Sequence, residues 1–269
     1  MTIDTAQLTS PGGTLEAFAA ANGLQYAENS PGPDYPSAIF HAGIDVTVQQ
    51  HYRPLAGQFF DIGNLRYYVG VPGLDYHSQH RGFIAIHLPS ALPHMFLDAT
   101  GNNRFGRTGL PVEFDSGQVL ELEGNFNDTF TLYARAGFEA DALYIFTPDL
   151  MALVLDQTAS FDVEIANDWM FVFSRERFDL ADAQLMSRLL GIVEVVGAKA
   201  RKQATNYRTE RATRVSLPKH SAGGVTVRGG LRSSVRATRG DYLRMALVLV
   251  GAGGFLLILI AGCILILGG

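Results

Sequence analysis

The chain has 269 residues, of which 47% are hydrophobic and 10% aromatic, and this composition excludes an intrinsically disordered protein. Residues 1–198 carry 24 acidic and 9 basic side chains, a charge of −15, whereas residues 199–269 carry 2 acidic and 12 basic ones, a charge of +10. The acidic part would repel phosphates, so we expect no nucleic-acid partner. The single cysteine, Cys263, excludes intrachain disulfides and cysteine-rich metal sites.

The N-terminal part predicts a short helix, a loop and a strand. Residues 14–22 predict a helix that Gly23 ends. Residues 30–36 contain three prolines, which interrupt regular structure, and therefore predict a loop. The first strand is expected over residues 45–52.

The next segment predicts more strands. Alternating apolar residues favour a hairpin between residues 59–62 and 65–71, with its turn at Gly63-Asn64. Another strand is expected over residues 83–88, and Pro89 is expected to end it.

Strands and helices alternate beyond residue 118. Strands are predicted over residues 119–123, 130–134 and 142–146, and a second hairpin over residues 161–173 with its turn at Asn167-Asp168. Thr147-Pro148-Asp149 is typical of a helix start, and that helix should reach about Asp156. A second helix is expected from about Leu180, with a basic continuation over residues 199–215.

These elements predict an α+β fold, with a mostly antiparallel, hairpin-rich sheet, a few packed helices and one C-terminal transmembrane helix. Residues 1–198 would form an acidic cytosolic domain, either as one unit or as two sub-lobes divided near residues 100–117. Residues 199–244 would form a basic helix extension and a Gly-, Ser- and Arg-rich linker, and residues 245–267 the span.

The predicted span has 23 residues without a charge. As a helix it would be roughly 34 Å long, enough to cross a hydrocarbon core of ~30 Å. Basic side chains precede it and would contact the membrane surface, namely Arg228, Arg232, Arg236, Arg239 and Arg244. The positive-inside rule keeps this cluster cytoplasmic, and residues 1–7 lack the features of a secretory signal. We therefore expect a single-pass, tail-anchored protein of the cell membrane with a cytoplasmic N-terminal domain.

One segment resembles a known family. Tyr144-x-x-Thr147-Pro148-x-Leu150-Met151 is similar to an uncharacterised family of membrane-associated bacterial proteins, a domain of unknown function seen in high-GC bacteria. The resemblance covers roughly residues 59–175. It implies membrane association and an α+β domain, and it supplies no catalytic residues.

The weak candidates for a metal site lie in one short segment. Asp75-x-His77-x-x-His80 is expected in a loop and offers ligand types that zinc or iron accepts. Histidines in a solvated loop explain the same pattern, so we expect no bound metal or other cofactor. Glu121 and Glu123 would share one face of a strand, either as an acid/base pair or as a solvated surface.

Nothing in the sequence identifies an enzyme. There is no Gly-x-Ser-x-Gly motif, and residues 1–198 contain no lysine for a Schiff base. We therefore expect a non-enzymatic interaction domain, serving as an accessory or scaffold component of a membrane complex. Its partners would be the lipid bilayer and a membrane protein, or a second copy through the span. The alternatives are a membrane-tethered enzyme or small-molecule- or metal-binding domain, and a basic tail that alternates between the acidic domain and anionic lipid.

Overall fold

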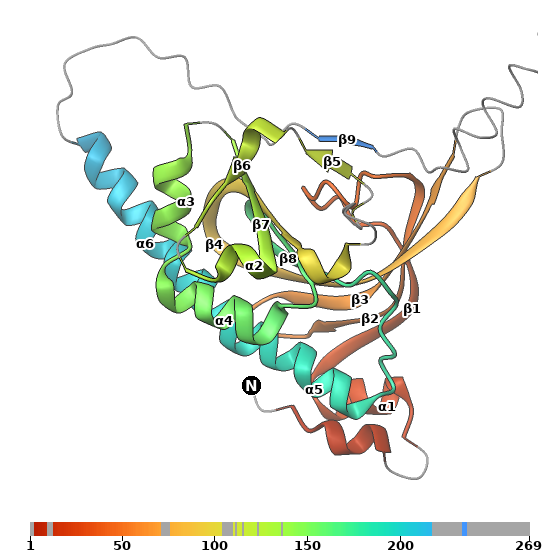
Figure 1. Ribbon diagram of the computed structural model, residues 1–269. Coiled ribbons are helices and arrows are strands. Elements are labelled where there is room, and N and C mark those ends of the chain that lie inside the picture. The colour runs from red at the N-terminus through yellow and green to blue at the C-terminus, as the bar shows by residue number, and fades with distance from the viewer. Residues whose placement is uncertain are drawn as a thin grey trace, which may run out of the picture.

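The computed structural model describes residues 3–9, 13–70, 76–103, 110, 112–114, 116–122, 124–135, 137–216 and 233–235. These residues form an antiparallel seven-stranded sheet with helices against one face (Figure 1). The predicted α+β class with a mostly antiparallel sheet is therefore confirmed. The predicted span, residues 245–267, lies outside the described residues. Within the described residues, we find no helix that is both apolar enough and long enough to cross a bilayer.

The strands follow the order β1-β2-β3-β4-β7-β6 across the sheet, and β8 pairs along the other edge of β4. Their bounds are β1 Leu24–Pro31, β2 Ile44–Pro54, β3 Phe60–Val69, β4 His77–Ala99, β6 Val119–Leu120, β7 Phe130–Ala134 and β8 Asp162–Phe173. A separate pair joins β5 Val112–Phe114 to β9 Ser233–Val235. Strands from both sides of residues 100–117 thus share one sheet, because β7 and β8 both pair with β4.

The helices are short except at the C-terminal end of the described chain. They are α1 Leu15–Ala21, α2 Phe126–Thr129, α3 Glu139–Ile145, α4 Pro148–Thr158, α5 Ala183–Gly191 and α6 Gly197–Ser216, with short 3₁₀ turns at Thr5–Thr9, Thr100–Asn102 and Ser116–Gln118. A π-helical turn, Ile192–Val196, joins α5 to α6 without a break. The predicted helices 14–22, 148–156 and 180 onward are confirmed, and so is the basic continuation beyond residue 199.

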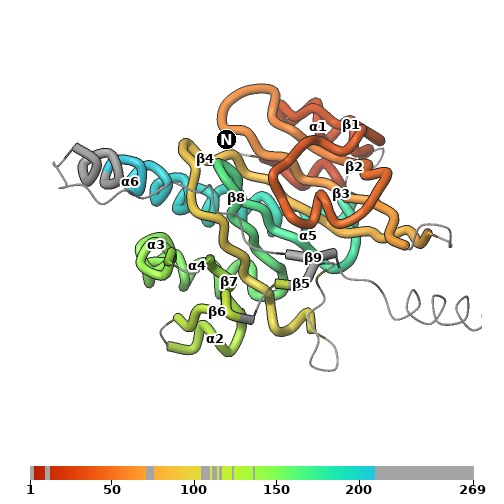
Figure 2. The backbone as a smooth tube through the Cα atoms, turned by 90° about the horizontal axis from the view of Figure 1, so that it is seen from above, coloured from red at the N-terminus to blue at the C-terminus, as the bar shows by residue number. Residues whose placement is uncertain are grey.

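The long strand β4 organises the sheet. Its first part pairs with β3 and its last part, Met95–Ala99, pairs with β7 on the same edge. Figure 2 shows β1–β3 beside the first part of β4, and β6 and β7 with α2 beside its last part. The predicted end of this strand at Pro89 is wrong. The pairing of β4 with β8 shifts register between His87 and Met95, and this irregular stretch accommodates a residue without an N–H donor.

Two predicted turns are also wrong, because the chain passes straight through them. Asn64 lies within β3, where its side chain donates to the Phe178 carbonyl at 3.0 Å and accepts from the Phe178 amide at 2.7 Å. Asn167 lies within β8 with a φ of 53°, at the register shift opposite Leu92. Asparagine tolerates this left-handed conformation, so the same residue suits a bulge or a turn.

The predicted strand over residues 142–146 is wrong as well. Residues 142–145 belong to α3 and Phe146 follows its end, and Ala142 and Ile145 are buried on one side of that helix. Their spacing of three residues fits a helical face, and a short apolar run does not distinguish the two structures. The predicted strand over residues 119–123 is shorter in the structure, because β6 ends at Leu120.

The two faces of the sheet carry separate apolar cores. The larger core lies between the sheet and helices α1 to α6, and includes Ile86, Phe130 and Ile192. The smaller core lies on the opposite face, where the segment of residues 32–43 covers β3, β4 and β8. Phe40 is 2% exposed there and packs edge-on against Phe83 at 5.2 Å between ring centroids. Each face of the sheet is therefore covered by other parts of the chain.

Candidate functional site

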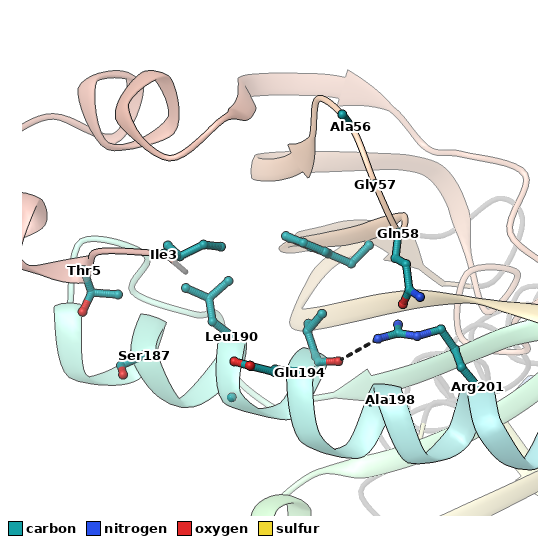
Figure 3. Close-up of a pocket in the computed structure, with 13 residues that line it drawn as sticks. Ile3, Thr5, Ala56, Gly57, Gln58, Ser187, Leu190, Glu194, Ala198 and Arg201 are labelled. Carbon is teal, nitrogen blue, oxygen red and sulfur yellow. Dashed lines mark hydrogen bonds between the residues drawn. The ribbon is translucent and has the colours of Figure 1, made fainter. Parts of the chain in front are cut away.

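A pocket of about 710 Å³ opens where three segments meet at one end of the sheet (Figure 3). These segments are the N-terminal residues, the turn between β2 and β3, and the continuous helix formed by α5, the π-turn and α6. The pocket is lined by Ile3, Thr5, Ala56, Gly57, Gln58, Phe60, Ser187, Leu190, Gly191, Val193, Glu194, Ala198 and Arg201. This volume lies in the range of sites for small organic molecules, roughly 300–1,000 Å³.

The helix supplies the floor of the pocket through an irregular turn. The π-turn buries Ile192, Val193 and Val196 while leaving Glu194 exposed. Such turns are rare and occur frequently at functional sites, because the extra residue changes which side chains face the neighbouring structure. Here it lies between Leu190 and Ala198, so side chains from both flanking helices line the same cavity.

The turn between β2 and β3 supplies the opposite wall. Gly57 has a φ of 91°, a conformation that favours glycine, and it lets the chain reverse between the two strands. Gln58 extends from this turn toward Arg201 across the pocket in Figure 3. Phe60, at the start of β3, is buried and also lines the pocket.

Arg201 is the notable polar residue of this pocket. Burial lowers the pKa of its guanidinium below the ordinary value. Its Nη2 donates to the Val193 carbonyl at 3.5 Å, the long contact drawn in Figure 3. Its Nη1 is buried and has no hydrogen-bond partner among the residues that the structure describes. A partly desolvated cation without an anionic partner favours an anion beside it.

Gly197 leaves the space that this arginine occupies. A Cβ atom added there would lie 3.3 Å from Arg201 Nη1 and 3.2 Å from Ile86 Cδ1. At Gly191, one wall of the pocket, an added Cβ would meet nothing within 4 Å. Both glycines have ordinary helical dihedrals. Larger side chains can therefore be introduced into the pocket at Gly191 without a clash.

Exposed apolar side chains lie next to the lining residues in the sequence. Leu55 is 69% exposed and Phe59 36% exposed, one at each end of the β2–β3 turn, and Val195 on the π-turn is 42% exposed. Together with Leu190 and Val193 they give this end of the molecule an apolar part, beside the polar lining residues Thr5, Gln58, Ser187, Glu194 and Arg201. The site thus combines apolar side chains with one cation, Arg201, and one exposed anion, Glu194.

The histidines singled out as metal candidates lie elsewhere. His77 and His80 are in β4, opposite Val69 and Arg66 of β3, and not in the expected loop. Strand alternation directs their side chains to opposite faces. Burial, with the Arg177 and Arg66 charges, lowers the pKa of His80. Asp75 lies outside the described residues, and among those described no group of three His, Cys, Asp or Glu side chains could hold a metal ion.

The other candidate residues are not brought together. Glu121 is exposed beyond the end of β6, and Glu123 lies outside the described residues. The predicted membrane-surface residues also lie outside them, namely Arg228, Arg232, Arg236, Arg239 and Arg244.

Sequence reasoning missed Arg201, although a signal was present. The residue follows Val193 and Gly197 at intervals of eight and four, so it shares the buried face of the helix. The basic residues around it instead predict a solvated helix extension. Within such a basic segment, the sequence does not single out one cation on an apolar face.

Comparisons with known proteins find only a distant similarity, to one solved structure. No family model matches it. No curated protein matches it. A solved structure, the crystal structure of the mycobacterial trehalose monomycolate transport factor A, TtfA, shares 11% sequence identity with a TM-score of 0.42. The alignment covers 68% of this chain and 93% of the mycobacterial chain.

Proposed function

We propose that this chain is a membrane-tethered accessory protein whose N-terminal domain binds a small amphipathic anion in the pocket between the β2–β3 turn and the α5–α6 helix. The observation that carries the proposal is the position of Arg201, a partly desolvated guanidinium with one buried, unpartnered Nη1, in the wall of a partly apolar pocket. The apolar walls favour a hydrocarbon body, and the guanidinium favours a carboxylate or phosphate head group.

The charge of the head group follows from the energetics of Arg201. A neutral ligand would remove more water from the guanidinium without replacing it. An anion in the pocket would supply a charged acceptor beside the guanidinium, and charge-assisted hydrogen bonds of this kind contribute about 1.5–3 kcal/mol. A cationic amphiphile would gain the same apolar contacts but would be repelled by Arg201. Glu194 also lines the pocket, but it is exposed and screened by water, whereas Arg201 is partly buried. The charge of Arg201 should therefore set the preference of the pocket for an anion.

Binding should accordingly distinguish matched amphiphiles. The full chain in phosphatidylcholine nanodiscs is titrated with dodecyl phosphate and with dodecyltrimethylammonium, which share one alkyl chain. We expect the anion to bind, and Arg201→Gln to weaken its binding at least about tenfold, equivalent to about 1.4 kcal/mol.

Arg208→Gln is the matched control. Arg208 is exposed on the same helix and outside the pocket, so this variant removes an equal charge without changing the lining. Equal affinity for the two amphiphiles, or an equal loss in both variants, would contradict the proposal.

The membrane attachment and orientation form the second part of the proposal. Residues 245–267 would cross the bilayer, the preceding arginines would contact anionic head groups, and the pocket would face the cytoplasm. The accessory role would be exercised through a membrane-protein partner, or through a second copy, recognised by the span.

Fractionation tests this attachment. We expect the full chain to stay with the membrane pellet after carbonate extraction and a chain lacking residues 245–267 to leave it. A stoichiometric partner should co-purify with the full chain in mild detergent and be lost with the span. A full chain that carbonate releases would refute the anchor, and a partner retained without the span would assign recognition to the N-terminal domain.

A further inference from the structure

A serine, a histidine and an aspartate form a continuous hydrogen-bond chain across β1, β2 and β3. The Ser30 hydroxyl lies 2.9 Å from His51 Nε2, and His51 Nδ1 lies 2.8 Å from Asp61 Oδ1. His51 is 3% exposed and Asp61 is fully buried. The imidazole thus stands between a hydroxyl and a carboxylate, with a different ring nitrogen toward each.

The surroundings of Asp61 determine which ring nitrogen carries the proton. Its Oδ2 accepts from Arg53 Nε at 2.8 Å and from the Tyr35 hydroxyl at 3.0 Å. Because Arg53 and Tyr35 both donate to this carboxylate, it acts as an acceptor toward His51 as well. His51 therefore donates from Nδ1, and in the neutral imidazole this leaves Nε2 as an acceptor for the Ser30 hydroxyl. This is the arrangement in which imidazole acts as a base toward serine.

Backbone irregularities direct the histidine toward the serine. The pairing of β2 with β3 shifts register between Gln49 and Tyr52, and Gln50 has a φ of 46°. Gly63 makes room on the facing strand, since a Cβ there would lie 2.4 Å from the His51 Cβ. Bulges of this kind often re-aim a side chain beside a functional site.

A second buried hydrogen-bond network in the chain also contains a serine and a histidine, but in a different order. There, Glu164 stands in the middle: it accepts from the Ser37 hydroxyl at 2.6 Å, and its Oε1 lies 2.8 Å from His94 Nε2. The Ser37 hydroxyl is bound to a carboxylate and is fully buried. Ser30, in contrast, is half-buried on the edge strand β1, between exposed Asn29 and Pro31. Reagents in solution can therefore reach Ser30 but not Ser37.

We propose that Ser30 is a nucleophile for acyl transfer from carboxylic esters, with His51 as its general base and Asp61 as the residue that positions the imidazole. Ser30 Oγ bonds to the ester carbonyl carbon while its proton passes to His51 Nε2. The alcohol then leaves with that proton, and water hydrolyses the acyl-serine by the same route. This activity is separate from the binding pocket, because Phe60 lines the pocket and the adjacent Asp61 faces the other side of β3.

Covalent labelling tests the nucleophile. The full chain in nanodiscs is treated with an alkyl fluorophosphonate, and the modified residue is located by mass spectrometry of the digested chain. We expect the adduct on Ser30, none in Ser30→Ala, and labelling at least about 100-fold slower in His51→Gln, since general-base assistance contributes about 10²–10⁴-fold. Ser90→Ala is the matched control, because the Ser90 hydroxyl donates to the Ala204 carbonyl. Its labelling rate should equal that of the wild type.

A second measurement separates chemistry from a structural role. In Ser30→Cys, the His51 base should lower the pKa of the introduced thiol below its usual ~8.5, as measured by the pH dependence of alkylation. Adding His51→Gln should return that pKa to the usual range. The proposal is overturned if the wild type is not labelled at Ser30, if His51→Gln labels as fast as the wild type, or if the introduced thiol titrates alike with and without His51.

Discussion

Replacing Glu164 with alanine is expected to destabilise the domain by about 3–5 kcal/mol. Glu164 is fully buried and accepts from the Ser37 hydroxyl at 2.6 Å and from the Ala38 amide at 2.9 Å. Alanine would leave both donors buried without this acceptor, and each such loss costs about 1–3 kcal/mol. Trp169, the single tryptophan, packs against Tyr35 at 4.7 Å between ring centroids, so its fluorescence during urea unfolding follows this region.

Glu176→Ala is the comparison for this variant. Glu176 is exposed, and the structure gives its side chain no hydrogen bond or ion pair among the described residues. Its replacement should change the free energy of unfolding by no more than about 0.5 kcal/mol. If Glu164→Ala behaved in the same way, Glu164 would not hold the segment of residues 32–43 against β8.

Replacing Phe40 with alanine should have a similar cost, about 3–5 kcal/mol, for a different reason. Phe40 lies on the covering segment and packs against Tyr35, Phe83 and Phe171, at 5.1, 5.2 and 6.0 Å between ring centroids. Its removal would leave a cavity in the smaller core that the neighbouring rings cannot fill. The measurement is again the midpoint of urea unfolding, which reports the free energy of unfolding when the dependence of that free energy on urea concentration is the same in both proteins.

Leu143→Ala provides the exposed counterpart. Leu143 is 52% exposed on α3, so we expect less than about 1 kcal/mol from its truncation. An equal loss in the two variants would indicate that residues 32–43 do not pack as a core layer.

The sequence predicted the elements whose signals are local. The helix over Pro148–Thr158 begins at the expected Thr-Pro-Asp sequence, and the basic helix beyond residue 199 follows from an apolar periodicity that starts earlier. The incorrect predictions came from residue types that occur in two kinds of structure. Asn64 and Asn167 suit turns, but one is held by the Phe178 backbone and the other forms a bulge, and both arrangements depend on distant chain segments.

Neither site could be read from spacing alone. Ser30, His51 and Asp61 are separated by 21 and 10 residues, and only the pairing of β1, β2 and β3 brings them together. The pocket joins Ile3 to Arg201 in the same way. Conversely, His77 and His80 are close in sequence, but strand geometry separates their side chains.

The central claim is that the pocket holds an amphipathic anion through Arg201. The most direct test is mass spectrometry of what remains bound to the full chain after purification from its own membranes. We expect about one amphipathic anion per chain in the wild type and in Arg208→Gln, and its loss in Arg201→Gln and in Gly191→Leu, which fills the pocket from a wall with free space. A wild-type chain without such an anion, or one that keeps it after both pocket substitutions, would contradict the claim.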